Sequence, residues 1–89
     1  MNENQNGFIP SLVDSIAAEV RAEMARKKQK ISTLSESIGM HPNVLGRKVR
    51  GDVEFTSSDL AEICLALNVP LPELLRRAEE AAKKAKETN

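Results

Sequence analysis

The chain has 89 residues, its 13 basic and 13 acidic residues balance to a net charge of zero, and it contains two Phe but no Trp or Tyr. A chain of this length forms one small domain, and a core built from Leu, Ile, Val, Met and Ala favours an all-α bundle over a sheet. Cys64 is the one cysteine and His41 the one histidine, which excludes an intrachain disulfide and leaves no cluster of metal ligands, so we expect neither metal nor cofactor.

Residues 1–7 are polar, and we expect residues 1–10 to form a flexible N-terminal arm. DNA-binding arms are usually basic, and this one is not. Phe8 and Ile9 have two interpretations that the sequence leaves open: they pack onto the helix that follows, or they contact a second copy of the chain.

Ser11 is a suitable N-cap for a first helix over about residues 12–28. Its apolar residues recur at helical spacing, and they are Leu12, Val13, Ile16, Val20 and Met24. Glu23 lies within the same sector, so we expect it at the edge of this face, paired with Lys27. The helix ends in a basic run made of Arg26, Lys27, Lys28 and Lys30. This run either complements the helix dipole or contacts phosphates.

A second, shorter helix is predicted over about residues 31–38, and Gly39 supplies the positive φ that ends it. The residues that share its inward side are Ile31, Leu34, Ser35 and Ile38. Ser32 and Thr33 lie near its N-terminus. Their hydroxyl groups either help to hold a phosphate or only cap the helix.

A third helix is predicted over residues 42–50, with proline in its first turn and Gly51 at its end. At about 100° per residue, Leu45 and Val49 share an inward face. The residues on the opposite face are Asn43, Arg47 and Arg50, beside Gly46. A short helix that presents one amide and two guanidinium groups after a glycine turn suits the major groove of DNA. We therefore interpret it as a recognition helix.

Phe55 follows in a loop, where we expect it to fill the core rather than stack on a base. Thr56 and Asp59 have capping-box spacing at the start of a fourth helix. The inward residues of that helix are Leu60, Ile63, Cys64 and Leu67. Leu65 falls off this stripe and is predicted to be exposed, and Asn68 is predicted to take a positive φ at the helix end.

A fifth helix is predicted to begin at Pro72. The residues on its apolar side are Leu74, Leu75, Ala78, Ala81, Ala82 and Ala85. Residues 79–89 are rich in Ala, Glu and Lys, and form a helical extension that either frays or packs against a second copy. The expected organisation is an arm (1–10), a domain (11–78) and this extension (79–89).

Charge is distributed unevenly along the chain. Residues 21–51 carry eight basic and two acidic residues, a net charge of +6, whereas residues 1–20 and 52–89 each carry −3. The positive charge is therefore concentrated in the segment that holds the glycine turn.

These signals, in this order and spacing, resemble the lambda-repressor-like, or Cro/C1-type (Xre family), helix-turn-helix domain of phage and bacterial repressors. The resemblance covers about residues 13–78. The motifs that carry it are Leu34-Ser35-x-x-Ile38-Gly39-Met40, Leu45-x-Arg47-Lys48-Val49-Arg50-Gly51, Phe55-Thr56 and Asp59-Leu60-x-x-Ile63-x-x-x-Leu67-x-Val69-Pro70. It implies a compact five-helix domain whose third helix enters the major groove, commonly as a dimer on a two-fold operator.

Carried over by position, the resemblance implies that the first residues of the third helix, with Arg47, face base edges, and that Arg50 and the start of the second helix face phosphates. Lys30 and Ile31 stand where many members have a polar cap followed by Gln, so Lys30 or Ser32 substitutes for the usual glutamine. Pro42 cannot donate a hydrogen bond, which shifts base recognition to Asn43 and Arg47. The predicted DNA-binding residues are Lys28, Lys30, Ser32, Thr33, His41, Pro42, Asn43, Val44, Gly46, Arg47, Lys48 and Arg50.

The predicted function is sequence-specific binding of a double-stranded DNA operator by a transcription regulator, a phage or bacterial repressor or Cro-like protein. A homodimer is expected through the fifth helix or through Phe8 and Ile9. The alternative is a protein-interaction module of the same fold, antitoxin-like or anti-repressor. An enzyme is not expected, because no acid–base pair or nucleophile constellation is present. With no signal peptide or long apolar run, we expect a soluble protein in the cytoplasm of a bacterial cell or phage-infected host.

Overall fold

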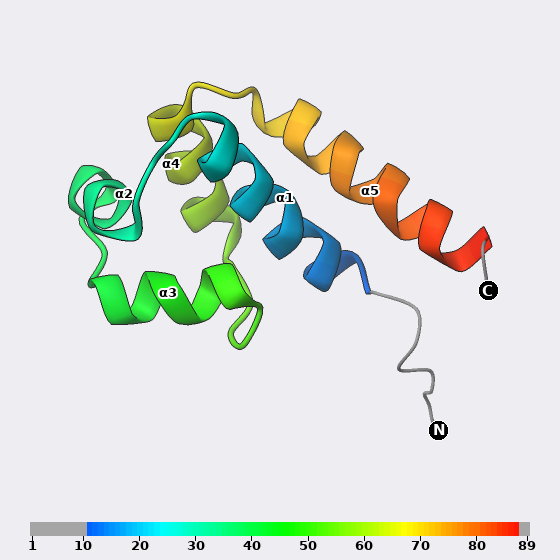
Figure 1. The fold of residues 1–89 in the computed structure, drawn as a ribbon, viewed down its shortest axis with the longest axis horizontal. Coiled ribbons are helices and arrows are strands. Elements are labelled where there is room, and N and C mark those ends of the chain that lie inside the picture. Colours follow the sequence, from blue (N-terminus) through cyan, green and yellow to red (C-terminus); the bar gives the residue numbers. More distant parts are fainter. Residues whose placement is uncertain (1–10, 88–89) are drawn as a thin grey trace.

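Five α-helices make up the computed structural model over residues 11–87, the part of the chain that the structure describes (Figure 1). In chain order they are α1 (Leu12–Arg26), α2 (Ile31–Ile38), α3 (Pro42–Arg50), α4 (Ser57–Leu67) and α5 (Leu71–Glu87). The predicted all-α, five-helix fold is confirmed, and the predicted bounds of α2 and α3 agree to the residue. The interpretations of residues 1–10, including Phe8 and Ile9, lie outside the described residues.

Side chains cap the starts of α1 and α4 as predicted. The Ser11 hydroxyl accepts a hydrogen bond from the Asp14 N–H at 3.1 Å. At α4 the Thr56 hydroxyl accepts from the Asp59 N–H at 3.0 Å, while the Asp59 carboxylate accepts from the Thr56 N–H at 2.9 Å. Each bond satisfies a backbone donor that the first turn of a helix leaves without a partner.

Residues in the left-handed conformation end α2, α3 and α4, and all three were predicted. Their φ angles are 69° at Gly39, 90° at Gly51 and 58° at Asn68. Glycine and asparagine adopt this region at the lowest steric cost, which is why these helix ends can be recognised in the sequence.

The end of α1 differs from the prediction. The helix stops at Arg26, two residues early, because Lys28 takes a φ of 55°. The Lys28 N–H donates to the Ala25 carbonyl at 3.2 Å and the Gln29 N–H to the Met24 carbonyl at 2.9 Å. These two bonds form a Schellman motif in which a lysine takes the position where glycine is usual. The residue type at this position therefore gives no sign that the helix ends here.

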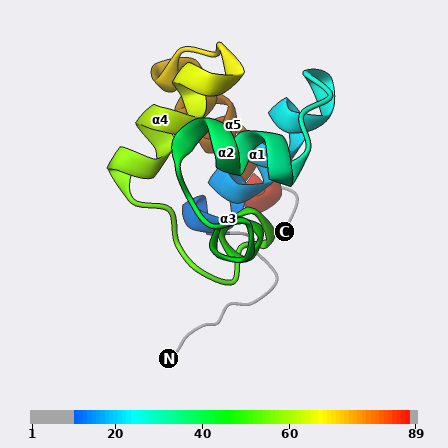
Figure 2. The ribbon, with the colours of Figure 1, turned by 90° about the vertical axis from the view of Figure 1, so that its left-hand side faces the viewer.

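The core lies between α1 and the other helices, with α5 packed along α1, α3 against α1 and α2, and α2 against α4 (Figures 1 and 2). Its largest fully buried side chains are Leu34, Leu45, Ile63, Leu67, Leu74 and Val20. Phe55 is buried in the loop after α3 and Cys64 is buried on α4, as expected, while Leu65 is 82% exposed.

The buried face of α1 is broader than predicted and begins later. Leu12 and Val13 have the right helical phase but are 49% and 37% exposed. Ser15, Ala17 and Glu23 are buried instead. Contact with α3 on one side and α5 on the other widens the buried arc, so small and charged residues enter it. The expectation that Glu23 lies at the edge was therefore wrong.

Helix α5 begins at Leu71, one residue before the predicted start, and continues to Glu87. Leu74 and Ala78 are buried against the bundle, whereas Leu75 is 36% exposed and Ala81 is exposed. The anchored face is thus narrower than the predicted one. Beyond Ala78 no residue of the described part of α5 is fully buried.

A buried carboxylate joins α1 to α5. The Glu23 side chain, 5% exposed, accepts hydrogen bonds from the Arg26 Nε at 2.9 Å and the Arg77 Nη1 at 3.0 Å. Its predicted pairing with Lys27 is present at 3.6 Å, and Arg77 also donates to Glu73 at 2.9 Å. We call these five residues the α1–α5 ion cluster.

The ionisation of both acids in this cluster is shifted. Burial opposes ionisation of Glu23, but the hydrogen bond and charge of Arg26, helped by two further cations, outweigh it and lower the pKa of Glu23. Hydrogen bonds from Arg76 and Arg77 lower the pKa of Glu73 to about 2. Both carboxylates therefore stabilise the fold in their ionised form.

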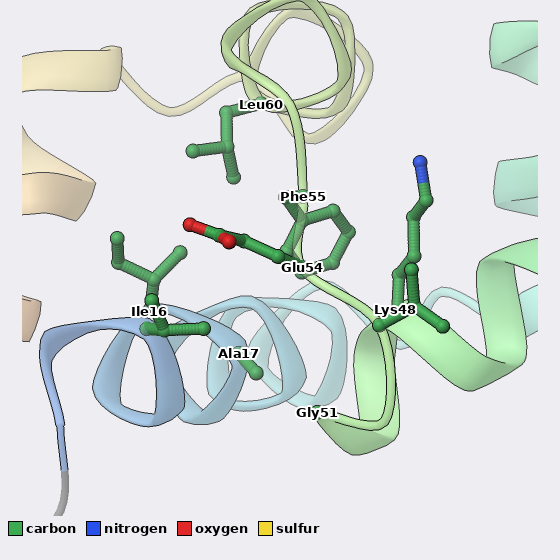
Figure 3. A pocket seen from close by; sticks show the side chains of 9 residues that line it. Ile16, Ala17, Lys48, Gly51, Glu54, Phe55 and Leu60 are labelled. Atoms are coloured by element: carbon green, nitrogen blue, oxygen red, sulfur yellow. The ribbon is translucent and has the colours of Figure 1, made fainter.

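A small pocket lies between α1, the end of α3 and the loop before α4 (Figure 3). Its wall is mainly apolar, with Ile16, Phe55 and Leu60 facing the space, and among the described residues only Lys48 and Glu54 contribute charged side chains. The pocket therefore offers apolar contact rather than a set of convergent polar groups.

Candidate nucleic-acid interface

Helices α2 and α3 form a helix-turn-helix. Gly39 ends α2 with its N–H directed to the Ser35 carbonyl, and the Met40 N–H donates to the same carbonyl at 3.0 Å. His41 then caps α3, and Pro42 occupies its first turn. Figure 2 looks along α3 and shows α2 packed above it. The turn thereby fixes α3 at the edge of the bundle with one face uncovered.

The outward face of α3 contains the three residues predicted there. Leu45 is 0% and Val49 7% exposed, and they pack into the core. The exposed residues of this helix are Pro42, Asn43, Val44, Arg47 and Arg50. The prediction that Asn43, Arg47 and Arg50 point away from the bundle is thus confirmed.

A shallow depression connects the start of α2 with this face. Ile31 contributes one wall, and α3 contributes the other through Asn43, Gly46 and Arg47. Gly46 lines this depression, and a Cβ there would meet the Arg50 guanidinium at an ordinary contact distance of 3.4 Å. The two helices therefore present one continuous surface.

The three cations of α3 differ in their partners. The Arg47 side chain makes no hydrogen bond or ion pair with any residue in 11–87. Arg50 lies 3.2 Å from the carboxylate of Asp52, with both side chains more than half exposed. Lys48 is different, because its ammonium donates to Asp59 and its side chain is only 13% exposed.

The Lys48–Asp59 pair ties α3 to the N-terminus of α4. Burial opposes ionisation of Asp59, but the hydrogen bonds from Lys48 and Thr56 outweigh it and lower the pKa of Asp59. One carboxylate thus caps α4 and holds α3. The ammonium of Lys48, a predicted DNA contact, is directed into this pair rather than outward.

The predicted residues before and at the start of α2 are exposed: Lys28, Lys30, Ser32 and Thr33. Lys30 occupies the N-cap position and makes no side-chain cap hydrogen bond. The hydroxyl groups of Ser32 and Thr33 make no hydrogen bond to the described part of the chain either. The capping interpretation of these hydroxyls therefore has no support among the described residues, and the phosphate interpretation stays a prediction.

The basic run at the end of α1 divides into two pairs. Arg26 and Lys27 turn to the α1–α5 ion cluster, and the Lys27 ammonium also donates to the Asn68 carbonyl at 3.3 Å. Lys28 and Lys30 have no hydrogen bond or ion pair from their side chains within residues 11–87. Arg26 and Lys27 thus have partners within the fold, whereas phosphate contact by Lys28 and Lys30 stays a prediction.

Arg21 supports the interface from behind and was not predicted. Its guanidinium donates to the Val49 carbonyl at 2.7 Å, at the last turn of α3. Carbonyl groups in the last turn of a helix lack partners, and a cation there is favourable. Arg21 lies 28 residues before Val49, so no local pattern in the sequence indicates the contact.

The chain matches the family model of the Cro/C1-type HTH DNA-binding domain over residues 19–80. It is also similar to a crystal structure of the clp gene regulator ClgR from Corynebacterium glutamicum, with 28% identity, a TM-score of 0.81, and coverage of 90% of this chain and 87% of that one. A second crystal structure of ClgR from this organism has 29% identity, a TM-score of 0.76, and coverage of 81% and 94%. No curated protein matches the chain. Within residues 11–87, no helix has the length and apolar character needed to cross a bilayer.

Proposed function

The chain belongs to the Cro/C1-type helix-turn-helix family of DNA-binding regulators, and from that premise we propose that it is a sequence-specific repressor of phage or bacterial origin that reads an operator with α3. The observation that supports this most is the exposed guanidinium of Arg47, which has no partner within residues 11–87. Such a group suits the O6 and N7 atoms of guanine, which a guanidinium contacts bidentately.

The neighbours of Arg47 complete the proposed base contacts. Asn43 is exposed one turn earlier and suits the N6 and N7 atoms of adenine. Val44, 44% exposed, suits the methyl group of thymine, with Pro42 and Gly46 allowing close approach.

Phosphate contacts fall to residues around this face. Arg50 lies in the last turn of α3, and the N-terminus of α2, which borders the same depression, contributes Lys28, Lys30, Ser32 and Thr33. These contacts give affinity without sequence information and weaken as salt rises. Because Lys48 is paired with Asp59, we assign it mainly to positioning α3.

The proposal includes a homodimer on a two-fold operator. The surface that supports it best is the extension of α5 beyond Ala78, where residues 79–87 remain helical although the bundle buries none of them fully. Phe8 and Ile9 are the other surface expected from the sequence. Sedimentation with and without an operator duplex distinguishes a dimer formed in solution from one formed only on DNA.

Selection of bound duplexes from a random pool tests this function directly. We expect enrichment of a two-fold sequence with half-sites separated by about one helical turn, roughly 10–10.5 base pairs. Placing that site over a promoter then distinguishes repression from activation. No enrichment at low salt would contradict the proposal.

One observation favours a second candidate, a protein-interaction module. Leu65 is 82% exposed and lies with Ile38 and Ala66 in a shallow depression between α2 and α4, away from Asn43 and Arg47. Loss of a partner on Leu65→Ser in a pull-down, together with no DNA shift at low salt, would favour this candidate over the repressor.

A further inference from the structure

His41 uses one edge of its ring to hold the start of α3. Its Nδ1 accepts a hydrogen bond from the Asn43 N–H at 3.1 Å, which makes His41 the N-cap of the helix. The side chain is exposed and makes no other hydrogen bond to the described residues. The Nε2 atom, on the opposite edge of the ring, is therefore open to solvent.

This cap determines which nitrogen carries the proton. A neutral imidazole has one donor nitrogen and one acceptor nitrogen, and the hydrogen bond at one of them selects the tautomer. Because Nδ1 accepts from the Asn43 backbone, the proton lies on Nε2. In this state the outer edge of the ring can donate a hydrogen bond but cannot accept one.

We propose that His41 is a specificity-determining residue whose Nε2–H donates to a hydrogen-bond acceptor on the DNA while Nδ1 caps α3. The inference rests on the proposed function, since it places His41 beside Asn43 at the end of a DNA-reading helix. Acceptors of this kind are phosphate oxygens and, in the major groove, purine N7, guanine O6 and thymine O4. A cytosine N4 amino group facing the ring would be disfavoured, because two donors would then meet.

Three variants of His41 separate its role as helix cap, through Nδ1, from its proposed role as hydrogen-bond donor, through Nε2. His41→Asn places an acceptor oxygen near the position of Nδ1 and removes the outer donor. His41→Gln places an amino group near the position of Nε2 and removes the cap, and His41→Ala removes both. Asparagine is among the best N-cap residues, so His41→Asn should keep the thermal midpoint of the native protein, while the other two lower it.

DNA affinity should depend on the outer hydrogen-bond donor at position 41 rather than on the helix cap. We expect His41→Asn and His41→Ala to bind the selected operator about three- to tenfold more weakly than the native protein, the value of one hydrogen bond, and His41→Gln to recover part of that loss. Operators with single base analogues that lack one major-groove acceptor (purine N7, guanine O6 or thymine O4), and operators with single neutral methylphosphonate linkages, distinguish a base contact from a phosphate contact. The loss caused by His41→Asn should vanish on the one modified duplex that lacks the partner.

Binding of His41→Asn within about twofold of the native protein would overturn the inference, since a residue that only caps the helix is replaced fully by asparagine. Arg47→Ala is the reference for the underlying function. If Arg47→Ala loses binding while His41→Asn does not, the inference about His41 fails alone. If Arg47→Ala also binds as the native protein does, the assignment of α3 fails.

Discussion

At the junction of α1 and α5, Arg26 and Arg77 donate to one buried carboxylate, that of Glu23, at 2.9 and 3.0 Å. On α3 the guanidinium of Arg47 has no partner among residues 11–87, and Arg50 meets only the exposed Asp52. Arginine thus occurs in two settings within this small domain. At the α1–α5 junction its charge is paired with a buried carboxylate, and on α3 it is exposed with an exposed partner or none among the described residues.

The difference separates the arginines that stabilise the fold from those that we propose to contact DNA. A buried carboxylate needs its cations, because an unpaired charge in the interior is costly, so the α1–α5 ion cluster holds the fold together. An exposed cation without a partner adds nothing to folding and remains available to phosphates and base edges. Substitutions in the two regions should therefore affect different measurements, stability in one and DNA binding in the other.

The largest expected effect is that of Glu23→Ala on stability. The change leaves two arginines without their acceptor, but Arg26 and Arg77 are 51% and 35% exposed and can turn to water. We therefore expect a loss of about 2–3 kcal/mol, somewhat less than for a fully buried pair. Urea unfolding measures it as a lower midpoint at unchanged slope.

Glu62→Ala is the control for this variant, because Glu62 is exposed on α4 and has no ion pair within the described residues. It should change stability by less than about 0.5 kcal/mol. Operator affinity of folded Glu23→Ala should equal that of the native protein. An unchanged midpoint for Glu23→Ala would show that the cluster is not needed for the fold.

Arg47→Ala should leave stability unchanged and reduce DNA discrimination. Loss of a bidentate guanine contact costs about 1–3 kcal/mol at one base pair, and little at the others. Arg50→Ala, its matched variant on the same face, should weaken all duplexes alike and make the salt dependence shallower. Gel-shift titrations against single-base operator variants measure both. Intact operator binding by both variants would contradict the role assigned to α3.

The helix ends show which parts of the fold can be predicted from the sequence and which cannot. Gly39, Gly51 and Asn68 are residue types that favour positive φ, and Thr56 with Asp59 is a local motif, so these ends could be located from neighbouring residues alone. Lys28 adopts the same conformation without such a preference. Its position depends on the packing of α1 rather than on its own chemistry, and it was missed.

The candidate site likewise has features that local sequence predicts and features that it does not. Helical phase alone placed Asn43, Arg47 and Arg50 outward and Leu45 inward. The pairing of Lys48 with Asp59 and the donation from Arg21 to Val49 join residues 11 and 28 positions apart. Such contacts depend on how the helices cross. The periodicity of a single helix does not predict its crossing with another helix, so these two contacts could not be predicted from the sequence.

Acid should weaken the paired region. The pKa of Glu23 is lowered from the ordinary 4.5, and that of Glu73 is lowered to about 2. A lowered pKa means that the stabilisation is complete above about pH 4.5 and is lost as the pH falls towards 2. Thermal midpoints should therefore fall through this window, and fall less in Glu23→Gln than in the native protein. A midpoint that stays constant or rises on acidification would contradict this account.

The smallest expected effect is that of Asp52→Asn, which removes the one ion-pair partner of Arg50 among the described residues. The pair of Asp52 with Arg50 is exposed, and such pairs contribute little to folding, so Asp52→Asn should leave the unfolding midpoint unchanged. The same change frees Arg50 and removes a negative charge from the DNA-facing side, which should tighten operator binding about two- to fivefold and steepen its salt dependence. Glu54→Gln is the control, because Glu54 lies in the same loop but has no ion pair within residues 11–87. Equal effects of the two changes would mean that only net charge matters, whereas a larger effect of Asp52→Asn would show that the protein itself restrains Arg50 before DNA binds.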